Sequence, residues 1–113
     1  MITVLTASDE KHIDDRHGPE GDADSNFDRL FLNWVGGYGK LVKEILDHGV
    51  GAPEEDASGR LIYKYYCNFN RKTGTGVDRE GKAVLFKGAE MVGTQSALVF
   101  FVETAYPKGI IKT

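Results

Sequence analysis

The sequence predicts an α+β domain, with N-terminal helices packed on one face of a C-terminal antiparallel sheet of about four strands. Apolar residues recur with helical spacing between residues 25 and 49, and they alternate with strand spacing after residue 60. Helices followed by strands with short connections are typical of the α+β class. The 113 residues fit a single domain, residues 1–113, which is long enough to bury a core without disulfides.

The first 25 residues are expected to be mostly irregular. Ile2–Leu5 is a short apolar run that predicts either a strand or an irregular arm. Ser8–Ser25 is rich in Asp, Glu, Gly and His, and it has neither helical nor strand periodicity over a useful length. We therefore expect a long polar surface loop, a kind of segment that often carries function.

Helix signals begin at Ser25, which can cap a helix and has Asp28 three residues later, close to a capping-box pattern. Two apolar sets with helical spacing follow: Phe27, Leu30, Phe31, Trp34 and Val35, then Tyr38, Leu41, Val42, Ile45 and Leu46. Gly36 and Gly37 between the sets either kink one helix or separate two. Gly49 is the expected C-cap of the second set.

Strand signals follow an acidic loop expected at Gly51–Gly59. Arg60–Phe69 is rich in Tyr, Ile and Phe, which favour sheets. One face of this strand is expected to carry Leu61, Tyr63, Tyr65, Cys67 and Phe69. Further strands are expected at Thr75–Val77, Ala83–Lys87 and Ser96–Tyr106, with a loop at Gly88–Gln95 and with Pro107 ending the pairing.

Charge is distributed unevenly along the chain, whose formal net charge is −3. Residues 1–59 contain 5 Lys and Arg against 13 Asp and Glu, whereas residues 60–113 contain 9 against 4. The basic half could face phosphates, although both halves could equally present ordinary solvated charges. No apolar run approaches the roughly 18 residues of a membrane span, and residues 1–8 do not resemble a signal peptide, so we expect no membrane anchor in this chain.

Cys67 is the only cysteine. One cysteine forms no intramolecular bridge and is too few for a zinc site built on thiolates. We expect a buried, unreactive thiol, and neither a metal nor another cofactor.

The histidines provide the first signal of chemistry. His12 and His17 lie five residues apart, with Arg16 between them. Metal-free RNA cleavage needs a base for the 2′-hydroxyl, an acid for the 5′-oxygen and a cation for the charged phosphorus, and these side chains could supply all three. Two alternatives remain: incidental loop residues, or a metal site with Asp14 and Asp15, whose spacing matches no metal motif.

A second group of candidates lies near the C-terminus. Thr104 and Tyr106 project from one face of the last predicted strand, where their hydroxyls could hold a phosphate or position a base. Alternatively, Tyr106 packs at the sheet edge and Thr104 serves strand propensity. Arg71 and Lys72 lie near aromatic residues, as in many RNA-binding surfaces, although most of those rings, and that of Trp34, are expected in the core.

The order of these signals resembles that of the toxin ribonucleases grouped with barnase, EndoU and the RelE-type toxins. The similarity is strongest to RNase-A-like and EndoU-like C-terminal domains of contact-dependent inhibition and other polymorphic toxins. Those domains have a His-x-x-x-(Lys/Arg)-His-Gly-like segment, then helices, then a sheet that ends in Thr-(Ala/Ser)-Tyr-Pro. Here the motifs are His12 to Gly18 and Thr104 to Pro107. The similarity in order covers about residues 11–108, and only the two motifs are specific.

The resemblance implies roles for particular residues. His17 would be the general acid or base, and Thr104 and Tyr106 would complete the site from the last strand. An arginine often joins them. Arg29 is the candidate on the first helix, one residue away from the expected spacing, and Arg16 is its substitute. His12 matches the family's first histidine, whose role is either catalytic or structural.

The resemblance also implies a function: metal-independent endoribonuclease activity that leaves a 2′,3′-cyclic phosphate, with a tRNA as one candidate substrate. It implies a cognate immunity protein that blocks the site, and the acidic loop Pro19–Asp24 would face either that protein or solvent. A larger secreted or surface protein would deliver the domain, which would then act in the target-cell cytoplasm.

Two other classes of function remain open. The first is a non-enzymatic inhibitor, such as an immunity or anti-defence protein, which would present its charge to a basic partner. The second is the toxin fold with another chemistry, because fold does not fix function. ADP-ribosyl transfer would need a nucleotide pocket, and the single cysteine excludes the paired cysteines of a zinc deaminase. Only the ribonuclease requires His17, Thr104 and Tyr106 to converge.

Overall fold

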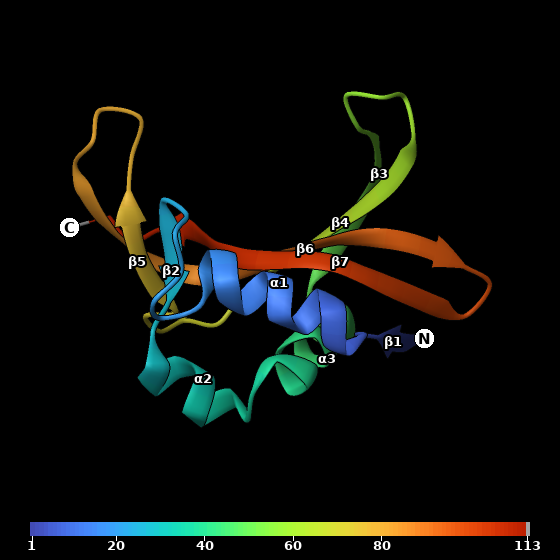
Figure 1. Ribbon diagram of the computed structural model, residues 1–113, viewed down its shortest axis with the longest axis horizontal. Coiled ribbons are helices and arrows are strands. Elements are labelled where there is room, and N and C mark those ends of the chain that lie inside the picture. The colour runs from blue at the N-terminus through green and yellow to red at the C-terminus, as the bar shows by residue number, and fades with distance from the viewer. Residues whose placement is uncertain (113) are drawn as a thin grey trace.

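The computed structural model describes residues 1–112 and confirms the α+β class (Figure 1). The helices are α1 (Ala7–His17), α2 (Arg29–Val35) and α3 (Tyr38–His48). The strands are β1 (Ile2–Val4), β2 (Ser25–Phe27), β3 (Val50–Glu55), β4 (Leu61–Asn68), β5 (Gly74–Val77), β6 (Ala83–Ser96) and β7 (Val99–Ile110). The sheet has seven strands rather than about four, and it is mixed because β1 pairs with β7 in parallel.

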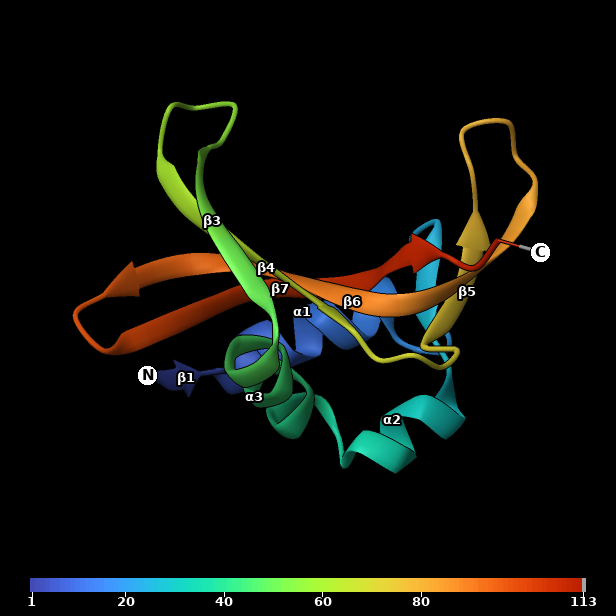
Figure 2. The same ribbon diagram turned by 180° about the vertical axis from the view of Figure 1, so that it is seen from behind.

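The long strand β6 organises the sheet, whose main order is β1-β7-β6-β4-β3. The first part of β6 pairs with β5, which in turn pairs with β2, and its later part pairs with β4. Figure 1 shows that the β3–β4 and β5–β6 hairpins rise on the side of the sheet away from α2 and α3, and Figure 2 shows the same arrangement from behind. One face of the sheet is therefore covered by helices.

The core lies between the helices and this covered face. Leu41, Val42 and Ile45 of α3 are buried, as the helical spacing predicts. They belong to one cluster with sheet residues that include Cys67, Ala89, Met91, Phe100 and Val102. The predicted face of β4 is confirmed for Tyr63, Tyr65, Cys67 and Phe69, which all contribute to this cluster, but not for Leu61, which is exposed. Ile62, on the opposite face of the strand, is also buried. Truncating a buried leucine or isoleucine here to alanine would cost about 2–5 kcal/mol.

Two glycines separate α2 from α3. Gly36 and Gly37 both have φ of +97°, a left-handed conformation that glycine adopts without strain. The sequence left open a kinked helix or two helices, and the structure has two. The helix signal at Ser25 was placed too early, since Ser25–Phe27 is β2 and α2 starts at Arg29 after Asp28.

The polar loop expected at Ser8–Ser25 is wrong, because Ala7–His17 forms α1. This helix buries only Ile13, so it has no apolar stripe for a periodicity search to detect. Local interactions stabilise it instead. The Thr6 side chain caps it by accepting from the Asp9 backbone N–H, and Lys11 pairs with Asp15 one turn later at 2.6 Å.

Two other expected loops are strands. Gly51–Gly59 was expected to be a loop, but most of it belongs to β3, an edge strand whose residues are all exposed and therefore do not alternate. Gly88–Gln95 was also expected to be a loop, but it is the middle of β6. Its glycines are required by close neighbours: a Cβ on Gly88 would clash with the Cys67 carbonyl oxygen and the Tyr66 hydroxyl, and one on Gly93 would clash with the Phe101 carbonyl oxygen and the Phe100 ring.

Pro107 does not end the pairing of the last strand, because it is buried and pairs with Ala89 within β7. β1 pairs only with Val99–Phe101, so within residues 1–112 no strand occupies the other edge of β7 at Pro107. A residue without an N–H is tolerated at such an edge. No helix in residues 1–112 is long and apolar enough to span a membrane.

Candidate functional site

Helix α1 carries the three candidates from the first motif. It runs beside β7 (Figures 1 and 2), with Ile13 turned into the core. His12 and Arg16 are four residues apart and so share one side of the helix, and His17 is its last residue. The chain after α1 satisfies its final carbonyls, since the N–H of Gly18 donates to Asp14 and the N–H of Ala23 donates to Arg16. The helix end that carries His17 is therefore well anchored.

A β-bulge in β7 sets the direction of the candidates from the second motif. Val92 pairs with Thr104 and the next residue of β6, Gly93, pairs with Val102, so Glu103 is the extra residue. Val102 and Ala105 are both buried although three positions separate them. The bulge thus shifts the alternation by one residue, and Thr104 and Tyr106 lie on the face opposite the helical core.

The two groups meet at an open hollow of about 590 Å³, called the His17 hollow below. It is lined by His12, Arg16, His17, Ala23, Asp24, Ser25, Thr104 and Tyr106. The His17 and Tyr106 rings lie against each other, with centroids 5.5 Å apart and planes at 41°. All five residues predicted as catalytic therefore line one hollow, although α1 and β7 are at opposite ends of the chain.

The imidazole of His17 is oriented by the backbone of β2. Its Nδ1 lies 2.8 Å from the carbonyl oxygen of Ser25, which can only accept a hydrogen bond. Nδ1 therefore carries the proton, and in the neutral ring the lone pair is on Nε2. Partial burial lowers the pKa of His17 despite the Ser25 contact, and the charges of Arg16 and His12 lower it further. The neutral form, which can accept a proton at Nε2, is thus favoured.

Two residues of this region, Glu90 and Lys108, were missed by the sequence reasoning. Glu90 is only 6% exposed and pairs across the strands with Tyr106. The Tyr106 hydroxyl donates to Glu90 Oε1, and Lys108 Nζ lies 3.1 Å from Glu90 Oε2. Burial, followed by the bond to Glu90, raises the pKa of Tyr106. The sequence offers one signal for Glu90, a carboxylate between the apolar residues Ala89 and Met91. This signal is informative only once the segment is recognised as a strand.

The charges at the hollow are mixed. Arg16 Nε lies 3.4 Å from Asp22, and both side chains are more than half exposed. An ion pair this exposed contributes under about 1 kcal/mol, so the guanidinium can readily exchange Asp22 for a phosphate. Asp24 adds a carboxylate to the lining, opposite in charge to Arg16.

The three residues predicted to bind RNA lie outside the His17 hollow. Arg29 lines a separate hollow of about 260 Å³ with Asp14, Asp15, Pro19 and Glu20. The guanidinium of Arg71 stacks on Trp34, 3.9 Å from the ring centroid, and Lys72 pairs with Asp28 at 3.0 Å. Trp34 is 56% exposed rather than in the core as expected, because it lies at the end of α2 and only partly contacts Phe31.

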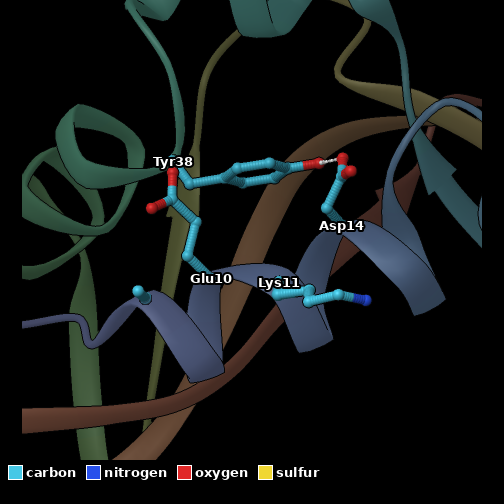
Figure 3. A pocket seen from close by; sticks show the side chains of 5 residues that line it. Glu10, Lys11, Asp14 and Tyr38 are labelled. Atoms are coloured by element: carbon cyan, nitrogen blue, oxygen red, sulfur yellow. Dashed lines mark hydrogen bonds between the residues drawn. The ribbon is translucent and has the colours of Figure 1, made fainter.

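Another pocket, of about 360 Å³, lies between α1 and α3 (Figure 3) and is lined by Ala7, Glu10, Lys11, Asp14 and Tyr38. Figure 3 shows the Tyr38 ring extending from the start of α3 to Asp14 on α1, whose carboxylate accepts from the tyrosine hydroxyl at 2.6 Å. Burial and this bond raise the pKa of Tyr38. The pocket contains none of the predicted catalytic residues, but its hydrogen bond holds the helix that carries His17.

The metal alternative has no convergent ligand set in the described part of the chain, because no group of three or more His, Cys, Asp and Glu side chains there is placed to hold a metal ion. Asp14 instead bonds Tyr38, and Asp15 pairs with Lys11. Cys67 is buried, as expected, and burial raises the pKa of its thiol.

The His17 hollow thus combines an imidazole held by a backbone carbonyl, an exposed guanidinium, a second histidine and two hydroxyls. Its function has to be inferred from these side chains. No protein-family model, curated protein or solved structure matches this chain.

Proposed function

We propose that the chain is a metal-independent endoribonuclease that cleaves RNA by transesterification at the His17 hollow. The observation that carries this proposal is the convergence of the five candidate side chains from α1 and β7 on one open hollow. If the two histidines were incidental surface residues, nothing would require them to lie beside the two hydroxyls of the last strand. Positioned groups within reach of one phosphate are what acid–base cleavage of RNA requires.

In this proposal His17 is the general base. Its Nε2 carries the lone pair because Nδ1 is bonded to the Ser25 carbonyl, and its lowered pKa keeps the ring neutral near pH 7. Nε2 takes the proton of the ribose 2′-hydroxyl as the 2′-oxygen forms a bond to phosphorus. The bond from phosphorus to the 5′-oxygen then breaks, leaving a 2′,3′-cyclic phosphate.

The other side chains of the hollow serve the phosphate and the leaving group. Arg16 exchanges its weak contact with Asp22 for a phosphate oxygen and stabilises the charge on the pentavalent phosphorus. Thr104 donates its hydroxyl to the same group. His12, one helical turn from Arg16 and exposed, gives its proton to the departing 5′-oxygen when it is in the imidazolium form.

The proposed biological role is that of a toxin domain. The activity would harm any cell that makes it, so a cognate immunity protein would cover the hollow in the producing cell. A larger secreted or surface protein would deliver the domain into the cytoplasm of a target cell, where RNA is the substrate. These partners follow from the resemblance of the two motifs together with the proposed activity.

One observation favours a second candidate, a non-enzymatic protein that acts by binding another protein. Leu30 and Trp34, four residues apart on α2, are 83% and 56% exposed, and Arg71 stacks on Trp34. Exposed tryptophan and arginine are enriched at the centres of protein interfaces. This surface does not include His17, so variants of the two regions separate the two functions.

Cleavage of total bacterial RNA in the presence of EDTA tests the enzyme. The wild type should give discrete fragments with cyclic phosphate ends, and His17→Asn should reduce the rate by at least about 100-fold. Asparagine keeps an amide donor near the Ser25 carbonyl but has no counterpart of Nε2, so this variant should stay folded. His48→Asn, at the exposed end of α3, is the matched control and should cleave normally. A folded wild type that leaves RNA intact would overturn the proposal and favour the second candidate.

A further inference from the structure

The buried carboxylate of Glu90 has a role that burial alone does not explain. Glu90 lies in the middle of β6 and is 6% exposed, while Ala89 and Met91 on either side point into the helical core. Burying a carboxylate is costly unless charged or hydrogen-bonding partners compensate. Lys108 Nζ lies 3.1 Å and 3.3 Å from its two oxygens, and the Tyr106 hydroxyl donates to Oε1.

The hydrogen bond to Glu90 fixes the polarity of Tyr106. A phenolic hydroxyl has one proton, and here that proton is directed to the carboxylate. Toward any other group, the Tyr106 oxygen can then only accept. His17 has the same polarity at Nε2, because its Nδ1 proton is directed to the Ser25 carbonyl. Two rings that lie 5.5 Å apart therefore both offer acceptors to a ligand in the His17 hollow.

We propose, on the basis of the ribonuclease function above, that Glu90 is a positioning residue that makes the Tyr106 oxygen an acceptor for the 2′-hydroxyl of a bound ribonucleotide. The proton of that hydroxyl lies between the Tyr106 oxygen and Nε2 of His17, in a three-centre hydrogen bond. The hydroxyl is thereby held where the imidazole removes its proton. A deoxyribonucleotide has no donor for the two acceptors, so the site distinguishes RNA from DNA at this position.

Substitution of Glu90 by glutamine is a sharp test, because it inverts the polarity with little change in shape. The Lys108 ammonium can only donate, so it attracts the amide oxygen of the introduced glutamine and turns the NH₂ group toward Tyr106. The Tyr106 oxygen then receives a hydrogen bond, and its own proton is released toward the hollow. In Glu90→Gln the 2′-hydroxyl therefore meets a donor instead of an acceptor.

The experiment measures binding of uridine 3′-monophosphate and 2′-deoxyuridine 3′-monophosphate by calorimetry or NMR titration. The wild type should bind the ribonucleotide about five- to tenfold more tightly, the effect of one net hydrogen bond. Glu90→Gln and Tyr106→Phe should both lose this preference. Lys108→Met leaves the bond between Glu90 and Tyr106 in place and should keep the ratio of affinities, whatever its effect on overall affinity. Circular dichroism and urea midpoints establish that each variant is folded.

Equal binding of the two nucleotides by the wild type, or no binding of either, would overturn the role of Glu90, and so would a preference that survives in Glu90→Gln. The RNA cleavage assay is independent of these results. An active wild type with no ribose preference would retain the ribonuclease and lose only this inference. A wild type without cleavage loses the proposed function directly.

Discussion

The Nδ1 atom of His17 lies 2.8 Å from the carbonyl oxygen of Ser25. The backbone of β2 therefore holds the proton on Nδ1 and leaves the lone pair of this last α1 residue on Nε2, where a ligand can meet it. This relationship joins the end of α1 directly to β2, as does the Asn26 side chain, which donates to the carbonyl oxygens of Arg16 and Gly18. It also makes the protonation of His17 a measure of the whole site, because Arg16 and His12 act on the same ring.

The titration of His17 should have its midpoint below the ordinary value of 6.5, since partial burial and the charges of Arg16 and His12 oppose protonation. Arg16→Gln removes one of these charges and should move the midpoint upward. The acidic limb of RNA cleavage should move in the same direction. NMR of the imidazole C–H signals measures the titration directly. Arg79→Gln, in the turn before β6, is the matched control and should leave it unchanged. An unshifted midpoint in Arg16→Gln would contradict the prediction.

Stability should depend on pH through the same residue. The pKa of His17 is lowered in the folded chain, so between that value and 6.5 the unfolded chain binds a proton that the folded chain does not. The stabilisation is complete above pH 6.5 and is lost as the pH falls through this window. The free energy of unfolding, measured with urea between pH 5 and 8, should depend less steeply on pH in His17→Asn than in the wild type. If His48→Asn flattened the slope equally, the effect would not belong to His17.

Tyr38→Phe should destabilise the protein by about 1–2 kcal/mol, because it removes the bond to Asp14 that joins α3 to α1. The pKa of Tyr38 is raised from 10.0, so the tyrosine stabilises the fold fully below pH 10 and loses this effect as the pH rises further. The free energy of unfolding, measured with urea, should therefore decline more steeply above pH 10 in the wild type than in the variant. Tyr63→Phe is the control, since no hydroxyl bond to Tyr63 is present within residues 1–112. Equal losses of stability in the two variants would contradict the role of the Tyr38–Asp14 hydrogen bond in joining α3 to α1.

The stacking of Arg71 on Trp34 should be visible in fluorescence, since Trp34 is the only tryptophan. Arg71→Ala uncovers one face of the ring and should move its emission to longer wavelength, with a loss of roughly 0.5–1 kcal/mol in stability. Lys72→Ala removes a neighbouring charge that pairs with Asp28 and should leave the emission in place. If both variants shift it equally, the cause is local unfolding of the β4–β5 connection rather than the stack.

The thiol of Cys67 should react slowly with a disulfide reagent in the folded protein. Cys67 is 7% exposed, and burial raises the pKa of its thiol, so little thiolate is accessible. The rate should rise by orders of magnitude in denaturing urea. A cysteine introduced as Lys82→Cys in a Cys67→Ala background provides the exposed reference. Fast reaction of Cys67 under native conditions would show that the strand opens locally.

The element that the sequence predicted best has one apolar face. Helix α3 buries a single side, and the spacing of its apolar residues reports this directly. Strand β4 was recognised from its β-favouring residues instead, since it buries Cys67 on one face and Ile62 on the other. Helix α1 buries only Ile13 and is stabilised by its cap and by polar contacts, which leave no periodic signal. The middle of β6 resembled a loop because Gly88 and Gly93 are there, and only their neighbours in space, Tyr66 and Phe100, explain them.

The candidate site divides in the same way. His12, His17 and the pair Thr104 and Tyr106 were predicted from motifs at the two ends of the chain, and the structure brings them to one hollow. Glu90 could be noticed only as a carboxylate between two apolar residues, because its contact with Tyr106 depends on the pairing of β6 with β7. Register is a property of the folded sheet. No local pattern around Glu90 reveals that it lies opposite Tyr106.

The extra residue at Glu103 makes neighbouring positions of β7 unequal in their tolerance of a change in chain length. Deleting Glu103 would place Thr104 directly after Val102 and restore ordinary alternation, so Thr104 and Tyr106 would keep their face while Ala105 and Pro107 stayed in the core. Deleting Ala105 instead would turn Tyr106 toward the helices and Pro107 toward solvent. In descendants of this chain, loss of the codon for position 103 is therefore compatible with the site, whereas loss of the codon for position 105 would abolish it and disrupt the core in one step.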